Sequence, residues 1–495
     1  MNVDCTYIQQ ISEAETVFDM AAVCYKILEE EIINPVGFIS RYIDESETRS
    51  QENPNCRALV SFSDFISERL EKYSELDFPK HKGEIVCRMR ETTLAAFQED
   101  KENQLTVVFM LLSTIDSLVP FWEEAIKSER VSLNKGKSRD TYLVYLSCRR
   151  CIHKELVQEI GRERKSVGDF GETLDNLLFL KRQDLPKGAR APEVSFLFRK
   201  AGETVHAKIA IIPGIQGTHF KIEKIGGSTE VIRYINELQI KSAERIWSKM
   251  QTAIQCGAEF IILPEFCVSE EILIYLKKKL SEHMQQDKGT SKLIAVFPGS
   301  TWIQPDDNVQ FILDAWGREI GRYYKNTPFR KKKRGKKGYE RCEGLTHPGH
   351  ETSLLRVEGI GHILPATCRD VIDGKYTEYL IRKFLPAFLF VPAWSSSGSS
   401  FERPLKELAA DYFTSSVLCN SCGALCKKTS VMGGAAVPCK NRTVAAGHFK
   451  KVQKTELMAE KCRKDCGELC SYILDINFGQ EVASSAKRIS CRKYE

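Results

Sequence analysis

Three residues far apart in the sequence supply the side chains that a nucleophilic attack on a carbonyl or nitrile carbon needs. They are Glu265, Lys325 and Cys368, which carry a carboxylate, an ammonium and a thiol. A thiol attacks such a carbon well only when a base takes its proton and a cation or donor stabilises the charge that develops on the substrate. Each of the three follows a strand-like segment, where open α/β folds place their chemistry. The set therefore predicts a nucleophilic cysteine site.

The segments that must position these residues alternate between strand and helix patterns. Continuous apolar runs predict buried strands at 208–213, 260–263 and 293–297, and amphipathic patterns predict helices at 230–257 and 270–283. Further strands are predicted at 309–313, 319–324, 363–366, 387–392, 416–419 and 472–476. Buried strands flanked by helices indicate an α/β domain in which helices cover the sheet.

The first 182 residues have a different pattern and predict an all-α helical domain of unknown role. Apolar residues recur there at three- and four-residue spacing. The helical segments lie near 18–28, 60–73, 84–99, 104–127 and 138–160. A stretch rich in proline, glycine and charge then predicts a linker at 183–204, followed by a domain at 205–480 and a C-terminal tail at 481–495.

The bulk composition is that of a folded protein with two domains. A chain of 495 residues exceeds what one hydrophobic core usually holds. No apolar stretch reaches the roughly 18 uncharged residues of a membrane span, and the N-terminus has no secretory signal pattern. We therefore predict a cytoplasmic protein whose 18 cysteines are reduced thiols. Their spacing does not match that of structural zinc sites, so no metal or cofactor is predicted.

The domain at 205–480 resembles the carbon–nitrogen hydrolase, or nitrilase, superfamily. The family has a glutamate after Leu-Pro, a lysine at a strand end, and a cysteine followed two residues later by an aspartate. Glu265, Lys325, and Cys368 with Asp370 match these motifs in the family's chain order. Pro298-Gly299-Ser300, Asn308 and Gly433-Gly434 are similar to other landmarks of the family. The resemblance implies an αββα sandwich, commonly joined into a homo-oligomer.

The resemblance also implies further site residues. Many members have a second glutamate after the lysine that positions the substrate or assists the base. Glu343 fits this role best, with Glu340 as the competitor. Arg369 and Trp394, which lie beside the cysteine and after the next strand, are the expected substrate contacts.

The mechanism that the resemblance implies is hydrolysis of a non-peptide C–N bond in an amide or nitrile. Glu265 would accept the thiol proton of Cys368, because an unperturbed thiol with a pKa of about 8.5 is mostly protonated at neutral pH. Lys325, with a backbone N–H near residue 369, would stabilise the oxyanion. A thioester intermediate would then be hydrolysed by water.

Two alternatives concern partners. The basic run 330–337 is typical of a solvated surface, and the alternative is attraction of a phosphate-bearing or nucleic-acid partner. As an alternative to an enzyme, the chain is an effector or scaffold subunit of a larger assembly. Nitrilase-like domains occur joined to reverse-transcriptase modules in bacterial anti-phage defence, and a preceding helical region suits that context. Oligomer size and nucleic-acid content of the purified protein separate these hypotheses.

Overall fold

The computed structural model divides the chain into two compact units, Met1–Asp184 and Leu185–Glu495. The structure describes residues 5–32, 78–99, 104–129, 142–146, 174, 176–185, 189–197, 206–213, 219–225, 229–235, 240–287, 290–303, 307–332, 339–345, 347–396, 398–421, 424, 431–439, 451–458, 471–477 and 484–488. Among these residues, no helix is long and apolar enough to cross a membrane.

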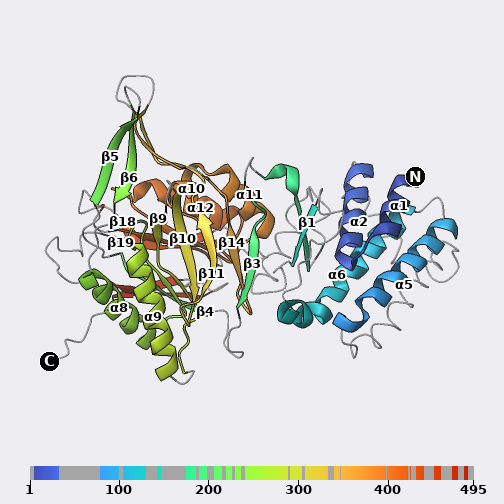
Figure 1. Cartoon of the computed structure of the whole chain (residues 1–495), viewed down its shortest axis with the longest axis horizontal. Coiled ribbons are helices and arrows are strands. Elements are labelled where there is room, and N and C mark those ends of the chain that lie inside the picture. The colour runs from blue at the N-terminus through green and yellow to red at the C-terminus, as the bar shows by residue number, and fades with distance from the viewer. Residues whose placement is uncertain are drawn as a thin grey trace. The chain divides into compact units, whose positions relative to one another are not determined.

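In the first unit, the described residues form helices and one antiparallel strand pair (Figure 1). Its elements are α1 (Cys5–Glu13), α2 (Val17–Glu31), α5 (Phe78–Glu99), α6 (Gln104–Glu129), β1 (Tyr142–Leu146), β2 (Leu177–Lys181) and the 3₁₀-helix η3 (Arg182–Asp184). Helix α2 begins at a capping box, in which the Thr16 hydroxyl accepts from the Asp19 N–H and the Asp19 carboxylate accepts from the Thr16 N–H. These two bonds satisfy donors that the first helical turn leaves free.

The prediction of an all-α first domain is wrong around residue 142. Strand β1 lies inside the helix predicted at 138–160 and pairs with β2. All five of its side chains are buried, and such a continuous apolar run with a valine and two tyrosines suits a strand better than a helix. The helix predicted at 60–73 lies outside the described residues.

The described residues of the second unit form three sheets. The largest has the strand order β11-β10-β8-β7-β4-β20-β21, with β9 paired to β10, and a seven-stranded sheet has the order β19-β18-β17-β16-β15-β14-β3. A smaller sheet has the order β12-β13-β6-β5. The strands are β3 (Glu193–Leu197), β4 (His206–Ile211), β5 (His219–Ile225), β6 (Thr229–Ile235), β7 (Phe260–Ile262), β8 (Ala295–Phe297), β9 (Ser300–Ile303), β10 (Asp307–Asp314), β11 (Glu319–Tyr324), β12 (Arg330–Lys332), β13 (Tyr339–Glu343), β14 (Ser353–Val357), β15 (Gly361–Pro365), β16 (Phe388–Ala393), β17 (Ser415–Asn420), β18 (Val431–Cys439), β19 (Lys451–Met458), β20 (Tyr472–Asn477) and β21 (Ser484–Arg488).

The two larger sheets pack face to face through aromatic side chains. The Phe297 and Phe390 rings lie 4.8 Å apart between their centroids, and the Phe260 and Phe390 rings 5.6 Å apart. Strands β4, β7 and β8 are parallel, and β7 and β8 are buried along their whole length, as expected for strands covered on both faces. These contacts form the central core of the unit.

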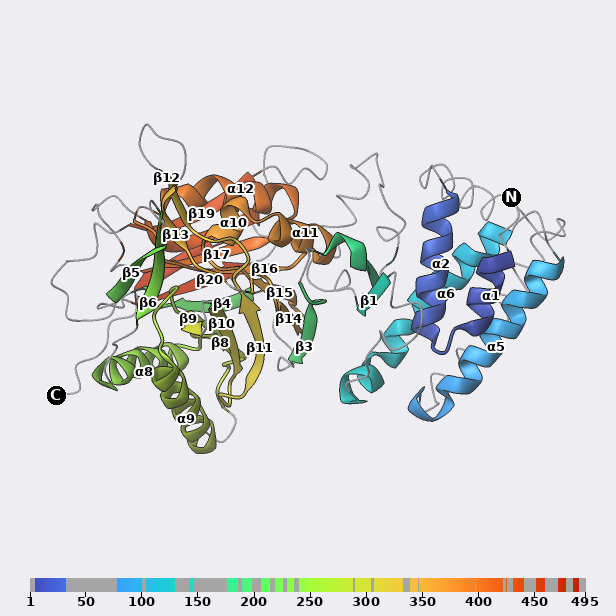
Figure 2. The same cartoon turned by 45° about the horizontal axis from the view of Figure 1, so that its top comes forward.

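Helices cover the outer faces of both sheets (Figure 2). They are α8 (Ile240–Gln255), α9 (Glu270–Gln286), α10 (Arg369–Asp373), α11 (Lys375–Phe384), the 3₁₀-helix η5 (Ser399–Phe401) and α12 (Glu402–Asp411). Helices α8 and α9 share a buried cluster with β7 and β8, and α12 contacts β17, β18 and β19. The second unit is therefore a mixed α/β fold, as predicted, with helices outside and two sheets inside.

Three predicted boundaries of this unit are wrong. Residues 229–235 form strand β6, so the helix predicted at 230–257 begins only at Ile240. Within the predicted linker, β3 pairs in parallel with β14, and within the predicted tail, β21 pairs with β20. The valine, isoleucine and tyrosine residues of β6 favour a strand, whereas β3 and β21 are short and are stabilised by pairing with other strands.

Candidate active site

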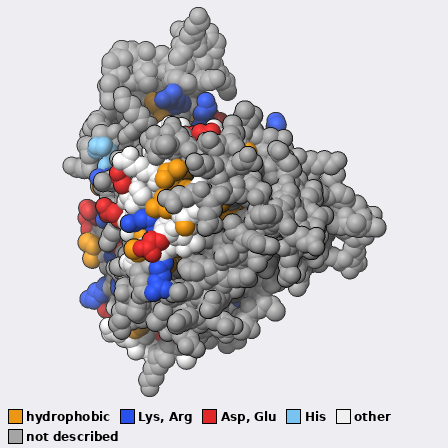
Figure 3. Space-filling model, turned by 90° about the vertical axis from the view of Figure 1, so that its right-hand side faces the viewer, with side chains coloured by type: hydrophobic (Ala, Val, Ile, Leu, Met, Phe, Trp, Pro, Cys, Tyr) orange, Lys and Arg blue, Asp and Glu red, His pale blue; other side chains and the backbone are white. Residues whose placement is uncertain are grey.

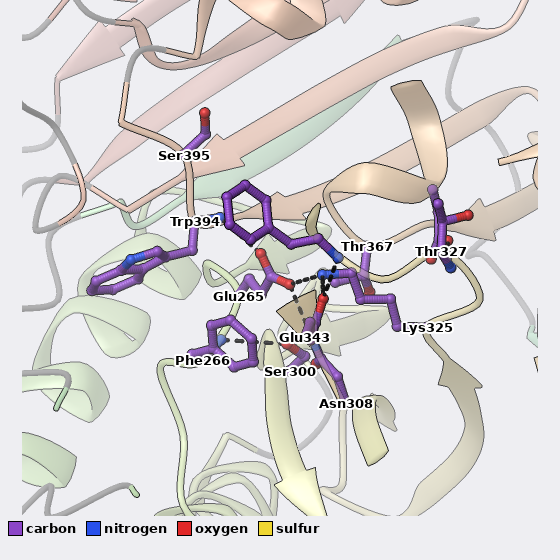
Figure 4. Close-up of polar contacts among 12 residues, drawn as sticks. Glu265, Phe266, Ser300, Asn308, Lys325, Thr327, Glu343, Thr367, Trp394 and Ser395 are labelled. Carbon is purple, nitrogen blue, oxygen red and sulfur yellow. Dashed lines mark hydrogen bonds and ion pairs between the residues drawn. The ribbon is translucent and has the colours of Figure 1, made fainter. Parts of the chain in front are cut away.

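The four acidic, basic and thiol side chains predicted for the site converge, because each follows or ends a strand. Glu265 lies after β7, Lys325 after β11 and Cys368 after β15, while Glu343 is the last residue of β13. Figure 4 shows the Glu265, Lys325 and Glu343 side chains pointing toward one another. The structure thus brings Lys325 into a direct bond with Glu265, which lies 60 positions earlier in the chain.

The ammonium of Lys325 is shared by two carboxylates. Its Nζ donates to Glu265 Oε1 at 2.7 Å and to Glu343 Oε2 at 2.6 Å, and all three side chains are buried. Asn308 Nδ2 also donates to both carboxylates, at 2.9 Å each. One ammonium and two carboxylates leave a net negative charge away from water. This charge makes the set of three side chains a better proton acceptor.

The Cys368 thiol is hydrogen-bonded to the Glu265 carboxylate and to the backbone of Trp394. The Trp394 N–H also donates to Glu265 Oε2, at 3.0 Å. Cys368 stands where β15 turns into α10, with φ at +50°, a value that costs a non-glycine residue about 1–2 kcal/mol. Its own N–H donates to the Pro392 carbonyl at 2.9 Å, which holds this strained turn in place.

Burial and charge shift the pKa of each of the three reacting groups. Burial raises the pKa of Glu265 above its ordinary range, against the opposing effect of Lys325. Burial and the neighbouring Glu265 also raise the pKa of Cys368. Burial alone would lower the pKa of Lys325, but the two carboxylates outweigh it and raise the pKa. The resting site therefore holds a neutral thiol, a cationic lysine and a carboxylate that is more basic than usual.

A close backbone approach fixes the turn that carries Glu265. Gly299 has φ at +80°, and a Cβ at this position would lie 1.9 Å from the Pro264 carbonyl oxygen. The next residue, Ser300, accepts the Phe266 N–H on its Oγ at 3.3 Å. Phe266 itself has φ at +60°. Glycine is thus required at 299 so that the segment around Glu265 can lie against the end of β8.

Asp370 joins the lysine strand to the cysteine turn. Its Oδ2 accepts from the Tyr323 hydroxyl at 2.8 Å, and the carboxylate also accepts from the backbone N–H groups of Asn326 and Thr327. Burial raises the pKa of Asp370 to about 6. The aspartate two residues after Cys368 therefore anchors the chain on either side of Lys325.

Comparisons with known proteins find similarity only among solved structures. No family model and no curated protein matches the chain. A cysteine-to-alanine mutant of the amidase from Nesterenkonia sp. AN1 in complex with butyramide matches with a TM-score of 0.37 and 13% identity, over 55% of this chain and 92% of that one. A glutamate-to-glutamine mutant of that amidase carries the acetamide moiety of fluoroacetamide at its active-site cysteine and matches with a TM-score of 0.35 and 14% identity, over 56% and 92%.

A further mutant of this amidase is described as belonging to the nitrilase superfamily. It matches with a TM-score of 0.37 and 14% identity, over 56% of this chain and 92% of that one. The chain is thus similar in structure to nitrilase-superfamily amidases over about 55% of its length.

The other predicted site residues differ in their contacts with Glu265, Lys325 and Glu343. Of the two glutamate candidates, Glu343 bonds Lys325, whereas the Glu340 side chain lies outside the described residues. Arg369 forms an ion pair with Asp373 along α10, and about a third of its side chain is exposed.

Trp394 contributes its backbone N–H, which donates to Glu265. From the sequence, Asn308 is recognisable only as a landmark of the resemblance. Its bonds to both carboxylates depend on tertiary contacts that no local pattern reports.

Proposed function

We propose that the second unit is a cysteine-dependent hydrolase of non-peptide C–N bonds that acts on amides or nitriles through a thioester. The observation that carries the proposal is the bonded chain from the Cys368 thiol to the Glu265 carboxylate and on to Lys325 Nζ, which lies 2.7 Å from Glu265 Oε1. A thiol, a base within hydrogen-bond reach and a fixed cation are the parts that such an attack requires.

In the first half of the reaction, Glu265 accepts the thiol proton as the Cys368 sulfur bonds to the carbonyl carbon of the amide. The raised pKa of Glu265 makes it a better proton acceptor than an ordinary carboxylate, and Lys325 opposes the rise in the pKa of the Cys368 thiol. Negative charge then develops on the carbonyl oxygen. Lys325 stabilises this charge, a contribution typically worth about 2.7–4 kcal/mol for one donor.

The C–N bond breaks as Glu265 returns its proton to the departing nitrogen, which leaves as ammonia and leaves an acyl group on Cys368. In the second half, Glu265 takes a proton from a water molecule whose oxygen attacks the thioester carbon. The C–S bond breaks, the thiol regains the proton and the carboxylic acid is released. With a nitrile, a first water adds to the thioimidate before ammonia leaves, and the same thioester follows.

Glu343 and Asn308 support this chemistry by holding Lys325 and Glu265. Without Glu343, the ammonium would have only the Glu265 carboxylate as an anionic partner among the described residues. The Asn308 amide donates to both carboxylates and so fixes them relative to each other. Fixed groups of this kind stabilise developing charge without reorganising during the reaction.

The test is a comparison of Cys368→Ala with Cys256→Ala, which removes an exposed free thiol elsewhere in the unit. Purified proteins are incubated with a panel of amides and nitriles, and ammonia release is measured. We expect Cys368→Ala to abolish turnover and Cys256→Ala to retain it. Mass spectrometry of the wild type should find an acyl adduct on Cys368 alone. Turnover by Cys368→Ala, or an adduct on another cysteine, would show that the nucleophile is assigned wrongly.

A further inference from the structure

Both backbone polar groups of Phe329 are hydrogen-bonded to Glu343. Its N–H donates to Glu343 Oε2 at 2.9 Å, and its carbonyl accepts the Glu343 N–H at 2.8 Å. The same Glu343 oxygen accepts from Lys325 Nζ at 2.6 Å. The backbone of Phe329 therefore lies two hydrogen bonds from the ammonium.

The segment that leads to Phe329 is anchored as well. The Asn326 N–H donates to the buried Asp370 carboxylate at 3.2 Å, and the Thr327 N–H donates to it next along the chain. Pro328 follows and restricts the backbone further. Residues 326–329 are thus held at both ends by carboxylates of the site, so the position from which the Phe329 ring projects is fixed.

The Phe329 side chain is partly exposed to solvent. Its exposed fraction is 39%, whereas that of Glu343, to which its backbone is bonded, is 5%. A bound group that covered the exposed part of the ring would remove apolar surface from water, which is favourable. On the buried side, the Phe266 ring lies 5.9 Å from Lys325 Nζ and packs against Trp302. An aromatic ring thus adjoins Lys325 on the buried side, and the backbone of a second aromatic residue is bonded to Glu343.

We propose that Phe329 is a specificity-determining residue that contacts the acyl group of the substrate and selects an apolar, preferably aromatic, acyl group. This inference rests on the proposed hydrolase function and names the substrate class. An aromatic acyl group would cover the exposed ring and gain an offset or edge contact with it, which a one-carbon acyl group is too small to make. A charged acyl group would lose hydration against the ring without a partner.

The experiment measures kcat/KM for phenylacetamide and acetamide in the wild type, Phe329→Ala, Phe329→Leu and Trp316→Ala. Trp316 is the matched control, because it is another exposed aromatic residue, at the opposite end of the β10–β11 hairpin from Lys325. None of these substitutions removes a backbone N–H. We expect the phenylacetamide-to-acetamide ratio to fall ~10-fold in Phe329→Ala. It should fall less in Phe329→Leu and stay unchanged in Trp316→Ala.

Calorimetry separates failure of this inference from failure of the proposed function. The affinities of both amides are measured for Cys368→Ala with and without Phe329→Ala. If no protein hydrolyses either amide, the inference is decided by binding alone, and a ~10-fold fall in the affinity ratio still supports the contact at Phe329. The hydrolase proposal is then decided by the panel of amides and nitriles. An unchanged ratio in both assays, equal losses in Phe329→Ala and Trp316→Ala, or no binding of either amide overturns the inference.

Discussion

At the scale of single residues, the site depends on how buried side chains of opposite charge pair away from water. Two carboxylates compete for Lys325, and Asn308 supplies the only side-chain amide that bonds both among the described residues. Buried ions cost several kcal/mol each to desolvate, and their mutual contacts offset this only when the remaining lone pairs are satisfied. Asn308 is therefore important to folding as well as to the chemistry.

Replacing Asn308 with leucine should lower the free energy of unfolding by about 3 kcal/mol, because two hydrogen bonds to charged groups are lost. Gln310→Leu is the matched control. It alters a buried amide two residues along the same strand, whose Nε2 has no partner among the described residues and whose Oε1 accepts only a 3.3 Å bond from Thr367. We expect it to cost about 1 kcal/mol or less. Urea unfolding measures both, and equal losses would contradict the argument.

At the scale of elements, the turns after strands do the positioning, and they do so with unusual backbone angles. Phe266 and Cys368 both have positive φ. Phe266 directly follows the proposed base Glu265, and Cys368 is the proposed nucleophile. Strain of this kind persists only where neighbouring contacts hold it, here Ser300 behind Phe266 and the Pro392 carbonyl behind Cys368. The local backbone is therefore held by the ends of adjacent strands.

Gly299→Ala tests this holding role against Gly257→Ala. Both glycines have φ at +80°, but a Cβ at 257 meets nothing within 4 Å, whereas one at 299 overlaps the Pro264 carbonyl and the Cys267 sulfur. Gly257→Ala should cost about 1–2 kcal/mol of unfolding free energy, from the backbone angle alone. Gly299→Ala should cost at least about 2 kcal/mol more and lower kcat, since Pro264 precedes Glu265. Similar costs in urea unfolding would count against the close approach.

At the scale of the whole molecule, charged side chains are not sorted by sign on the face drawn in Figure 3. Lysine, arginine, aspartate and glutamate side chains of the described residues are interspersed there with hydrophobic ones. Of the basic run 330–337, positions 333–337 lie outside the described residues. A nucleic-acid partner and a homo-oligomer therefore stay predictions.

The division into two units leads to a prediction about where the second one can be cut. Strand β3 forms the edge of the seven-stranded sheet and bonds β14, so a fragment of residues 205–495 loses it and exposes the β14 edge. A fragment of residues 185–495 keeps the pair. We expect the longer fragment to unfold in urea at a midpoint close to that of this unit in the full chain, and the shorter one to unfold earlier or aggregate. Equal midpoints would show that β3 contributes little.

Local patterns predicted most strands of the second unit and the residues at their ends. The buried run 260–263 and the hairpin through Gly317 are recognisable because continuous apolar residues and a glycine turn are local signals. Local patterns failed at β1, β3 and β6. The valine and tyrosine residues of β1 and β6 favour strands, so the helix predictions there misread the local pattern, whereas β3 is stabilised by its pairing with the distant β14.

The sequence by itself determined which chemical groups stand at the ends of strands: a carboxylate at 265, an ammonium at 325 and a thiol at 368. Only the tertiary structure decided that one ammonium bonds both Glu265 and Glu343, that Trp394 brings a backbone N–H, and that Asn308 joins the two carboxylates. The reason is physical. Strand formation depends on neighbours in the chain, whereas the partner of a buried charge depends on which strand ends the packing of two sheets brings within about 3 Å.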